Sequence, residues 1–467
     1  MKPIIKLFKN RASYRIYTVA LSIIFLQSCE KMLEVDLPAN QIETEYVFNN
    51  LQSADAALAS LYGNLRDSSP ISGGTTGSGV LLGCYTDDLD SYAPAGENTG
   101  IRDLYLNVQN DSNAAVLAYW TSAYKEVYMA NAIIQGIDQS TGISAKDKSR
   151  IKGEALFIRS LIYYYLMQVF GDIPYTTSTD YTMNSSLPKL ALPELKSRIR
   201  DDLSLAVTLM DDAYRNTERI FPNKKAAQLL LAKVYISDQQ WAQAETLLTD
   251  ILASPLYSFE PDVTKVFLKS GSHILWQIKP KNANDPTQEI QSLYFVNAAP
   301  TRYALTGNLV NSFSATDKRK LNWMASVTVG ANIWYRADKY KNRTANATEY
   351  SIVYRIEEAY LMMAEVQARQ NKVGQALPYV NATRLRAGLT TLSASITPDN
   401  LLNEIILENR KEFFTEMGHR FLDLKQSGSL QELSLVKPNW KPYSVLWPIP
   451  QKELLLNPNL NPQNYGY

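Results

Sequence analysis

The 467-residue chain has the composition of a globular protein, with 45% hydrophobic and 20% charged residues, and it is long enough to bury one large core or two smaller ones. Five of its 47 basic residues but none of its 46 acidic residues lie within residues 1–28, so the rest of the chain carries a formal charge of −4. This slightly acidic body argues against a general nucleic-acid-binding protein, which needs a basic surface.

The first 28 residues are predicted to be a lipoprotein signal peptide. A basic segment precedes "IYTVALSIIFL" (16–26), which is too short to span a membrane but has the length of a signal-peptide core. The following "LQSC" resembles the bacterial lipobox, in which the cysteine is lipidated and becomes the first residue of the mature protein. We therefore predict lipidation at Cys29 and a lipid-anchored linker over residues 29–50. The alternative is an ordinary signal peptide that happens to contain a cysteine.

Helical periodicity dominates the first half of the mature chain. Apolar residues recur at helical spacing in 50–67, 114–138, 147–170 and 192–213. Residues 68–100 are rich in Gly, Ser and Thr, and we expect a loop there without a regular helix. Within this loop lies Cys84. Once Cys29 is lipidated, Cys84 has no disulfide partner in the mature chain. A small apolar residue of this kind is expected in the core. A catalytic Cys–His pair stays open as the alternative.

The stretch "RSLIYYYLMQVFGDIPY" (159–175) raises the question of whether Tyr163, Tyr164 and Tyr165 form a platform for a ligand. Successive helical residues point about 100° apart, so three adjacent rings cannot form one flat surface. Apolar residues surround nearly the whole helix, which is typical of a helix covered by other helices. We therefore interpret these tyrosines as packing residues.

A repeat signal follows in "AKVYISDQQWAQAETLL" (232–248) and "AEVQARQNKVGQALPYV" (364–380). Both copies place two alanines twelve residues apart, where small side chains allow two antiparallel helices to cross closely around a short turn. The pattern is similar to the tetratricopeptide repeat.

Between these copies, residues 255–350 contain five prolines, and 273–279 and 292–297 have the alternation of strands. A last helix is expected over 400–418. The proline-rich tail, 436–467, is expected to wrap the surface.

Several segments together resemble the SusD/RagB family of outer-membrane nutrient-uptake lipoproteins. They are, in chain order, "SCEKMLEV", "GEALFIRSLIYYYLMQVFGDIPY", "YRIEEAYLMMAEVQA", "ILENRKEFFTEMGHRFLDLKQSG" and "LWPIPQKELLLNPNLNPQNYGY". The resemblance implies a mainly α fold, with tetratricopeptide-like helix pairs in a right-handed helical scaffold and an irregular, partly β, loop-rich insert. The parts expected on this basis are an N-terminal helical part at 51–255 and a C-terminal part at 256–467, with the insert at 256–350 and the tail at 436–467.

The same resemblance implies function and partners. It implies a surface lipoprotein of the outer membrane that captures an oligosaccharide and delivers it to a SusC-like TonB-dependent transporter. It implies no reaction and no required cofactor or metal, although the sequence leaves open whether a calcium ion assists.

Sugars present flat CH faces and many hydroxyls, so their sites combine aromatic rings with polar groups. Two irregular regions, 84–98 and 291–340, have that mixture. The candidate glycan-binding residues in them are Asp88, Tyr92, Tyr294, Arg302, Tyr303, Trp323 and Trp334. For each aromatic residue the alternative is local packing, and for the acidic cluster the alternatives are a solvated turn or a capping group.

The segment "ENRKEFFTEMGHRFLDLK" (408–425) contains groups that could act in acid–base chemistry. We interpret it instead as a buried ion-pair network that holds the last helix to the scaffold. Two other functions therefore compete with glycan capture: a lipid-anchored glycosidase that uses carboxylates from 87–90, and a helical-repeat scaffold that binds only protein.

Overall fold

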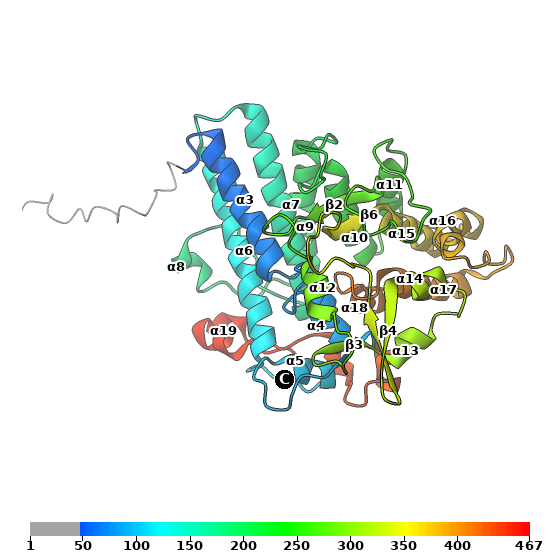
Figure 1. The fold of residues 1–467 in the computed structure, drawn as a ribbon. Coiled ribbons are helices and arrows are strands. Elements are labelled where there is room, and N and C mark those ends of the chain that lie inside the picture. The colour runs from blue at the N-terminus through cyan, green and yellow to red at the C-terminus, as the bar shows by residue number, and fades with distance from the viewer. Residues whose placement is uncertain (1–46) are drawn as a thin grey trace, which may run out of the picture. The chain divides into compact units, whose positions relative to one another are not determined.

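Two long helices, α6 (Ala114–Gln139) and α7 (Ala145–Phe170), run side by side at the centre of the N-terminal half (Figure 1). The computed structural model describes residues 47–467, so the predicted signal peptide, Cys29 and most of the linker lie outside the described residues. Residues 48–467 form one unit by their internal contacts. The helix α3 (Leu51–Ser68) packs on α6 and α7, and α9 (Leu192–Leu209) packs along α7.

The central helix α7 is buried on nearly all sides, as its continuous apolar sequence requires. Tyr163, Tyr164 and Tyr165 are only 0%, 7% and 2% exposed, so the prediction that they are packing residues is confirmed. Their hydroxyls find partners inside the protein: Tyr163 donates to the Thr176 carbonyl at 3.1 Å and Tyr165 to the Met417 carbonyl at 3.1 Å.

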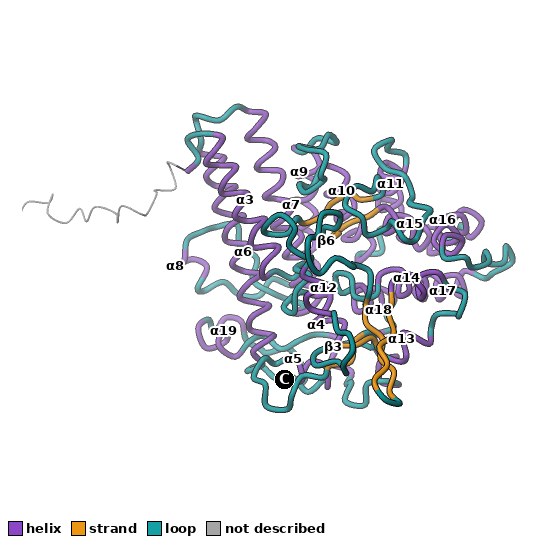
Figure 2. Tube along the Cα trace, viewed as in Figure 1, coloured by secondary structure: helices purple, strands orange, loops and turns teal. Residues whose placement is uncertain are grey.

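Two helix pairs correspond to the predicted repeats. The first pair is α10 (Lys224–Ser237) and α11 (Trp241–Leu252), and the second is α15 (Ile356–Arg369) and α16 (Val373–Arg386). The four spaced alanines are completely buried, and α11 packs against α15, so the pairs stack although 132 residues separate their sequences. The mainly α fold with tetratricopeptide-like pairs is confirmed, and helices dominate the trace in Figure 2.

Two small antiparallel sheets complete the fold. One has the order β1-β3-β5-β4, and the other pairs β2 with β6. Their bounds are β1 (Leu89–Ser91), β2 (Ile274–Ile278), β3 (Tyr303–Leu305), β4 (Met324–Val329), β5 (Asn332–Ala337) and β6 (Ser351–Arg355). The four-stranded sheet joins the 84–98 region to the insert, because Leu89 pairs with Leu305 and Leu305 with Tyr335.

The remaining elements are short or lie towards the C-terminus. Helices of the N-terminal half and the insert are α4 (Ser78–Tyr85), α5 (Ile101–Leu106), α8 (Tyr181–Asn184), α12 (Gln288–Leu293), α13 (Gly307–Asn311) and α14 (Lys318–Trp323). Those of the C-terminal region are α17 (Pro398–Phe413), α18 (His419–Ser427), η2 (Leu430–Leu435), η3 (Pro442–Val445), α19 (Gln451–Leu456) and η4 (Pro458–Leu460). Within residues 47–467, no helix is both long and apolar enough to cross a membrane.

Two predicted elements are wrong because local context overrides composition. The expected loop 68–100 contains α4, whose residues are nearly all buried, including Cys84 at 0% exposure. The expected strand 292–297 is instead the end of α12 and an irregular segment, because the Thr287 side chain caps a helix there.

The C-terminal region also differs from the prediction. The helix expected to run to 418 ends at Phe413, and α18 begins after Gly418, which has a positive φ of 76° and no room for a side chain: a Cβ would lie 2.7 Å from Leu82 Cδ1 of α4. The tail does more than wrap the surface, since Trp440 and Trp447 insert into the core at 4% and 0% exposure.

Candidate functional site

An exposed pair of aromatic rings marks the edge where the 84–98 region meets the insert. Asp90 lies in β1, and Tyr92 is the first residue after that strand. Because the two residues are two positions apart in extended backbone, their side chains project from the same face of the sheet. The Tyr92 backbone N–H donates to the Arg302 carbonyl at 2.7 Å, which extends the β1–β3 pairing by one residue. The Trp334 side chain of β5 lies close enough to the Tyr92 hydroxyl to affect its pKa. Tyr92 is 39% exposed and Trp334 is partly exposed, so both rings are open to solvent.

Charged and polar groups surround these rings. The Tyr105 hydroxyl donates to Asp90 Oδ1 at 3.0 Å, and Arg302 forms an ion pair with Glu97 at 3.4 Å while its side chain stays 53% exposed. Partial burial and the Asp90 carboxylate raise the pKa of Tyr92, so its hydroxyl is neutral at neutral pH and can donate a hydrogen bond. We call Asp90, Tyr92, Glu97, Arg302 and Trp334 the Tyr92–Trp334 surface.

Tyr294 lies beside this surface, but the protein's own cations cover its ring. The guanidinium groups of Arg336 and Arg343 lie 4.4 and 4.2 Å from the ring centroid. Arg336 is two residues from Trp334 on β5 and therefore projects from the same face. Tyr294 is thus placed to position Arg336 next to Trp334 rather than to stack on a ligand itself.

Three of the predicted site residues are buried and have structural partners. Asp88 is 1% exposed and pairs with Arg410 at 3.0 Å, and Tyr303 is 3% exposed within β3. Trp323 is 1% exposed, and its indole N–H donates to the Val263 carbonyl at 2.9 Å. The expectation that these side chains project from loops towards a ligand is therefore corrected. Sequence reasoning placed them in irregular segments, but packing between those segments buries them.

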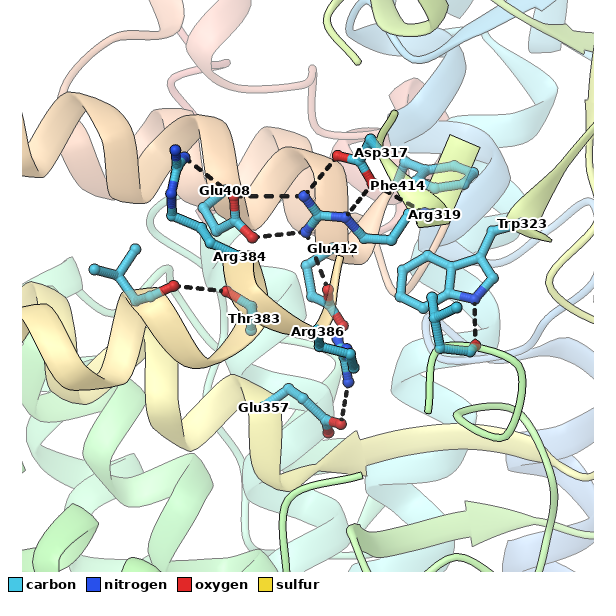
Figure 3. Close-up of polar contacts among 12 residues, drawn as sticks. Asp317, Arg319, Trp323, Glu357, Thr383, Arg384, Arg386, Glu408, Glu412 and Phe414 are labelled. Carbon is cyan, nitrogen blue, oxygen red and sulfur yellow. Dashed lines mark hydrogen bonds and ion pairs between the residues drawn. The ribbon is translucent and has the colours of Figure 1, made fainter. Parts of the chain in front are cut away.

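The charged C-terminal segment forms the predicted buried ion-pair network (Figure 3). Its centre is Glu412, which is 0% exposed and accepts hydrogen bonds from Arg355 and Arg386 on one oxygen and from Arg319 on the other at 3.2 Å. Arg319 also binds Glu408 at 2.7 Å. The network ties α17 to α14, β6 and α16.

Sequence reasoning named the acidic members of this network but missed its three arginines. Arg319, Arg355 and Arg386 are at most 5% exposed. For Arg355 and Arg386 the mostly apolar flanking residues were the available signal, because a buried guanidinium requires carboxylate partners, whereas Arg319 lies between Asp317, Lys318 and Lys320 and gave no such signal.

A second group of ion pairs joins the same segment to the region after α4. Arg410 pairs with Asp87 at 3.0 Å and with Asp88 at 3.0 Å, and Arg420 pairs with Asp87 at 2.8 Å. Two of the three carboxylates in 87–90, those of Asp87 and Asp88, are thus engaged by guanidinium groups, whereas Asp90 accepts a hydrogen bond from Tyr105.

The electrostatics of the network are those of permanently paired charges. Burial alone would raise the pKa of Glu412, but Arg386, Arg355 and Arg319 hold it well below its usual range. A carboxylate of this kind does not exchange protons near neutral pH. Within residues 47–467, no group of three His, Cys, Asp or Glu side chains is arranged to hold a metal ion.

The pair Glu358–His419 should make stability depend on pH. Against the effect of burial, Lys233 and His419 lower the pKa of Glu358 from 4.5 to about 2, and Glu358 raises that of His419 from 6.5 to about 9. The Glu358 contribution is present above pH 4.5 and is lost as pH falls towards 2. The His419 contribution is present below pH 6.5 and is lost as pH rises through 9.

We therefore expect the melting temperature, measured from pH 2 to 10, to be highest between these limits. His419→Asn should remove most of the alkaline decline and also reduce the acid decline, because His419 is one of the two cations that lower the pKa of Glu358. An alkaline decline that is the same in the variant would show that other groups cause it.

Comparisons with known proteins agree with this architecture. Residues 44–236 match the family model described as "Starch-binding associating with outer membrane", and residues 273–467 match the model of the SusD family. SusD-like protein P25 of Formosa agariphila is 24% identical over 516 residues, covering 94% of this chain and 97% of the relative.

Solved structures show the same fold. A SusD superfamily protein from Bacteroides vulgatus superposes with a TM-score of 0.77 at 19% identity, covering 90% of this chain and all of that one. A laminarin-binding SusD-like protein superposes with a TM-score of 0.75 at 20% identity, with the same coverage.

Proposed function

The chain belongs to the SusD/RagB family, and from this premise we propose that it captures an oligosaccharide at the cell surface and delivers it to a SusC-like TonB-dependent transporter in the outer membrane. The protein would be held there by a lipid on Cys29. The observation that carries the proposal is the Tyr92–Trp334 surface, in which two solvent-accessible aromatic rings lie near the exposed Arg302–Glu97 ion pair and the Asp90 carboxylate.

This combination suits a saccharide. A pyranose ring places its CH face on an aromatic ring and its hydroxyls on polar groups at the edge of that ring. Tyr92 and Trp334 supply the rings, and Arg302 supplies the edge groups together with Glu97 and the Tyr92 hydroxyl. The similarity to a protein named for laminarin binding supports a glycan as the ligand class.

Binding without catalysis is the function that the geometry favours. A glycosidase needs two carboxyl groups facing the scissile bond. Asp87 and Asp88 are 6% and 1% exposed and are paired with Arg410 and Arg420, which leaves Asp90 as the one accessible carboxylate of the 87–90 candidates. Nothing specific favours the glycosidase alternative or a scaffold that binds only protein.

Tyr92→Ala and Trp334→Ala are each expected to weaken glycan binding by roughly tenfold or more, because loss of one stacking ring at a hot spot costs about 1–3 kcal/mol. The wild-type protein, without residues 1–28, would first be screened on a glycan array. Calorimetry would then measure the variants against the glycan that is retained most strongly.

The matched control is Tyr465→Ala, a substitution at a tyrosine that is 87% exposed and outside this surface. It should bind normally. Unchanged affinity in both surface variants would exclude these rings as the site, and a wild-type protein that retains no glycan would contradict the proposed function.

Cys29→Ala should give a folded protein that leaves the membrane fraction, because the variant lacks the residue that carries the lipid. Fractionation of cells that lack the transporter tests whether the lipid anchors the protein. Purification in mild detergent, with both proteins expressed, tests whether the transporter binds to it. A Cys29→Ala variant that stays in outer membranes without the transporter would contradict lipidation. Repeated failure to recover the transporter with wild-type protein would contradict delivery.

A further inference from the structure

We propose that a groove between α6, α8 and α19 is a second saccharide-binding site, specific for neutral sugars. The inference that the ligand is a saccharide rests on the proposed function, whereas the groove itself is a separate feature that contains no residue of the Tyr92–Trp334 surface. In Figure 1, α8 and α19 lie beside the α6 helix.

The groove has an aromatic wall and a size suited to a small ligand. Trp120, Tyr124 and Tyr128 follow one another at four-residue spacing on one face of α6, and Tyr181 of α8 faces the same space. The cavity holds about 350 Å³, within the range of ligand pockets.

Hydrogen bonds between distant segments fix the groove before any ligand arrives. The Tyr124 hydroxyl donates to the Pro174 carbonyl at 2.7 Å, which joins α6 to the segment after α7. Asn457 donates to the Leu187 carbonyl at 2.8 Å, and Asn459 to the Ser186 carbonyl at 2.7 Å, which joins that segment to the tail. A preformed groove loses less entropy when it binds.

The solvent-exposed groups of the groove, aromatic rings and a carboxylate, are of the kinds that bind sugars. The side chains of Tyr128 and Tyr181 are 53% and 81% exposed, far more than packing rings. Glu453 of α19 lines the groove, and within residues 47–467 no hydrogen bond or ion pair engages its carboxylate. Partial burial raises the pKa of that carboxyl, and hydrogen bonds from sugar hydroxyls would compensate for the lost water.

The charge of the groove indicates which class of ligand it can bind. Glu453 is the charged residue among its lining residues, which include no lysine or arginine. A phospholipid surface or an acidic sugar would require cations, so the groove favours a neutral saccharide. The hydroxyl groups of Thr121 and Ser185 also line the groove, where they can accept hydrogen bonds from a sugar.

The test uses two double variants and one control. Tyr128→Ala/Tyr181→Ala removes the exposed rings of the groove, and Tyr92→Ala/Trp334→Ala removes those of the first surface. Tyr465→Ala is the matched control. Calorimetry would titrate each with the neutral oligosaccharide that the wild type retains most strongly on the array, and melting curves would verify folding.

We expect two sites per wild-type chain and one per chain in each double variant, with tenfold or greater loss at the removed site. A groove variant that keeps the wild-type stoichiometry and affinities overturns the second site and leaves the proposed function intact. Loss of oligosaccharide binding in the groove variant alone supports the second site but contradicts the proposal that the Tyr92–Trp334 surface is a binding site.

Other occupants would appear as other outcomes. A wild-type protein that retains only acidic glycans overturns the neutral groove, and one that retains no glycan overturns both proposals. Binding to phosphatidylethanolamine vesicles that Tyr128→Ala/Tyr181→Ala abolishes, without any effect on glycan binding, would assign the groove to a lipid surface instead.

Discussion

Glu412→Ala is expected to destabilise the protein by about 3–5 kcal/mol, because removing one partner from a buried ion-pair network leaves uncompensated charges in the core. Three guanidinium groups, those of Arg319, Arg355 and Arg386, share this single carboxylate. Denaturation by urea and by heat would measure the loss, and the variant should unfold at markedly lower denaturant.

The matched control lies on the same helix. Glu404 of α17 is 37% exposed and pairs with Arg384 at 3.5 Å, so Glu404→Ala should change stability by less than about 1 kcal/mol. Equal losses at the two positions would show that the network contributes nothing beyond a surface ion pair.

Trp323→Ala is also expected to cost about 3–5 kcal/mol, because it leaves a large cavity in the core and removes the partner of the Val263 carbonyl. Trp334→Ala serves as its counterpart: the two tryptophans lie on either side of β4 in the insert sequence, but only Trp323 is buried. Melting curves should therefore shift strongly for Trp323→Ala and little for Trp334→Ala. The opposite order would reverse the assignment of the two residues to core and surface.

Long helices and helix pairs could be predicted from the sequence because their signal is local. Apolar spacing marks α6 and α7 directly, and the paired alanines mark α10–α11 and α15–α16. The α4 helix could not be found in this way, since Gly79 and Gly83 within its eight residues disfavour a helix. Its buried position against the Gly418 turn, more than 300 residues away, decides its structure.

For the candidate site, composition identified the two correct regions but not the orientation of each side chain. Asp88 and Asp90 are two residues apart in one acidic segment, yet Asp88 is buried at 1% exposure and Asp90, in β1, is accessible near Tyr92. The difference comes from Arg410, which reaches Asp88 from α17. The sequence pattern alone does not show that Arg410 lies next to Asp88.

The ion pairs that join the 87–88 turn to α17 and α18 also affect the order in which the protein can fold. Asp88 meets Arg410 across 322 positions of the chain, and Asp87 meets Arg420 across 333. A chain that is synthesised from its N-terminus presents the two aspartates long before Arg410 and Arg420 have been made. The N-terminal helices can therefore assemble early, but the turn that carries Tyr92 reaches its final position only when nearly the whole protein has been made, and closing so long a loop should be a slow step of folding.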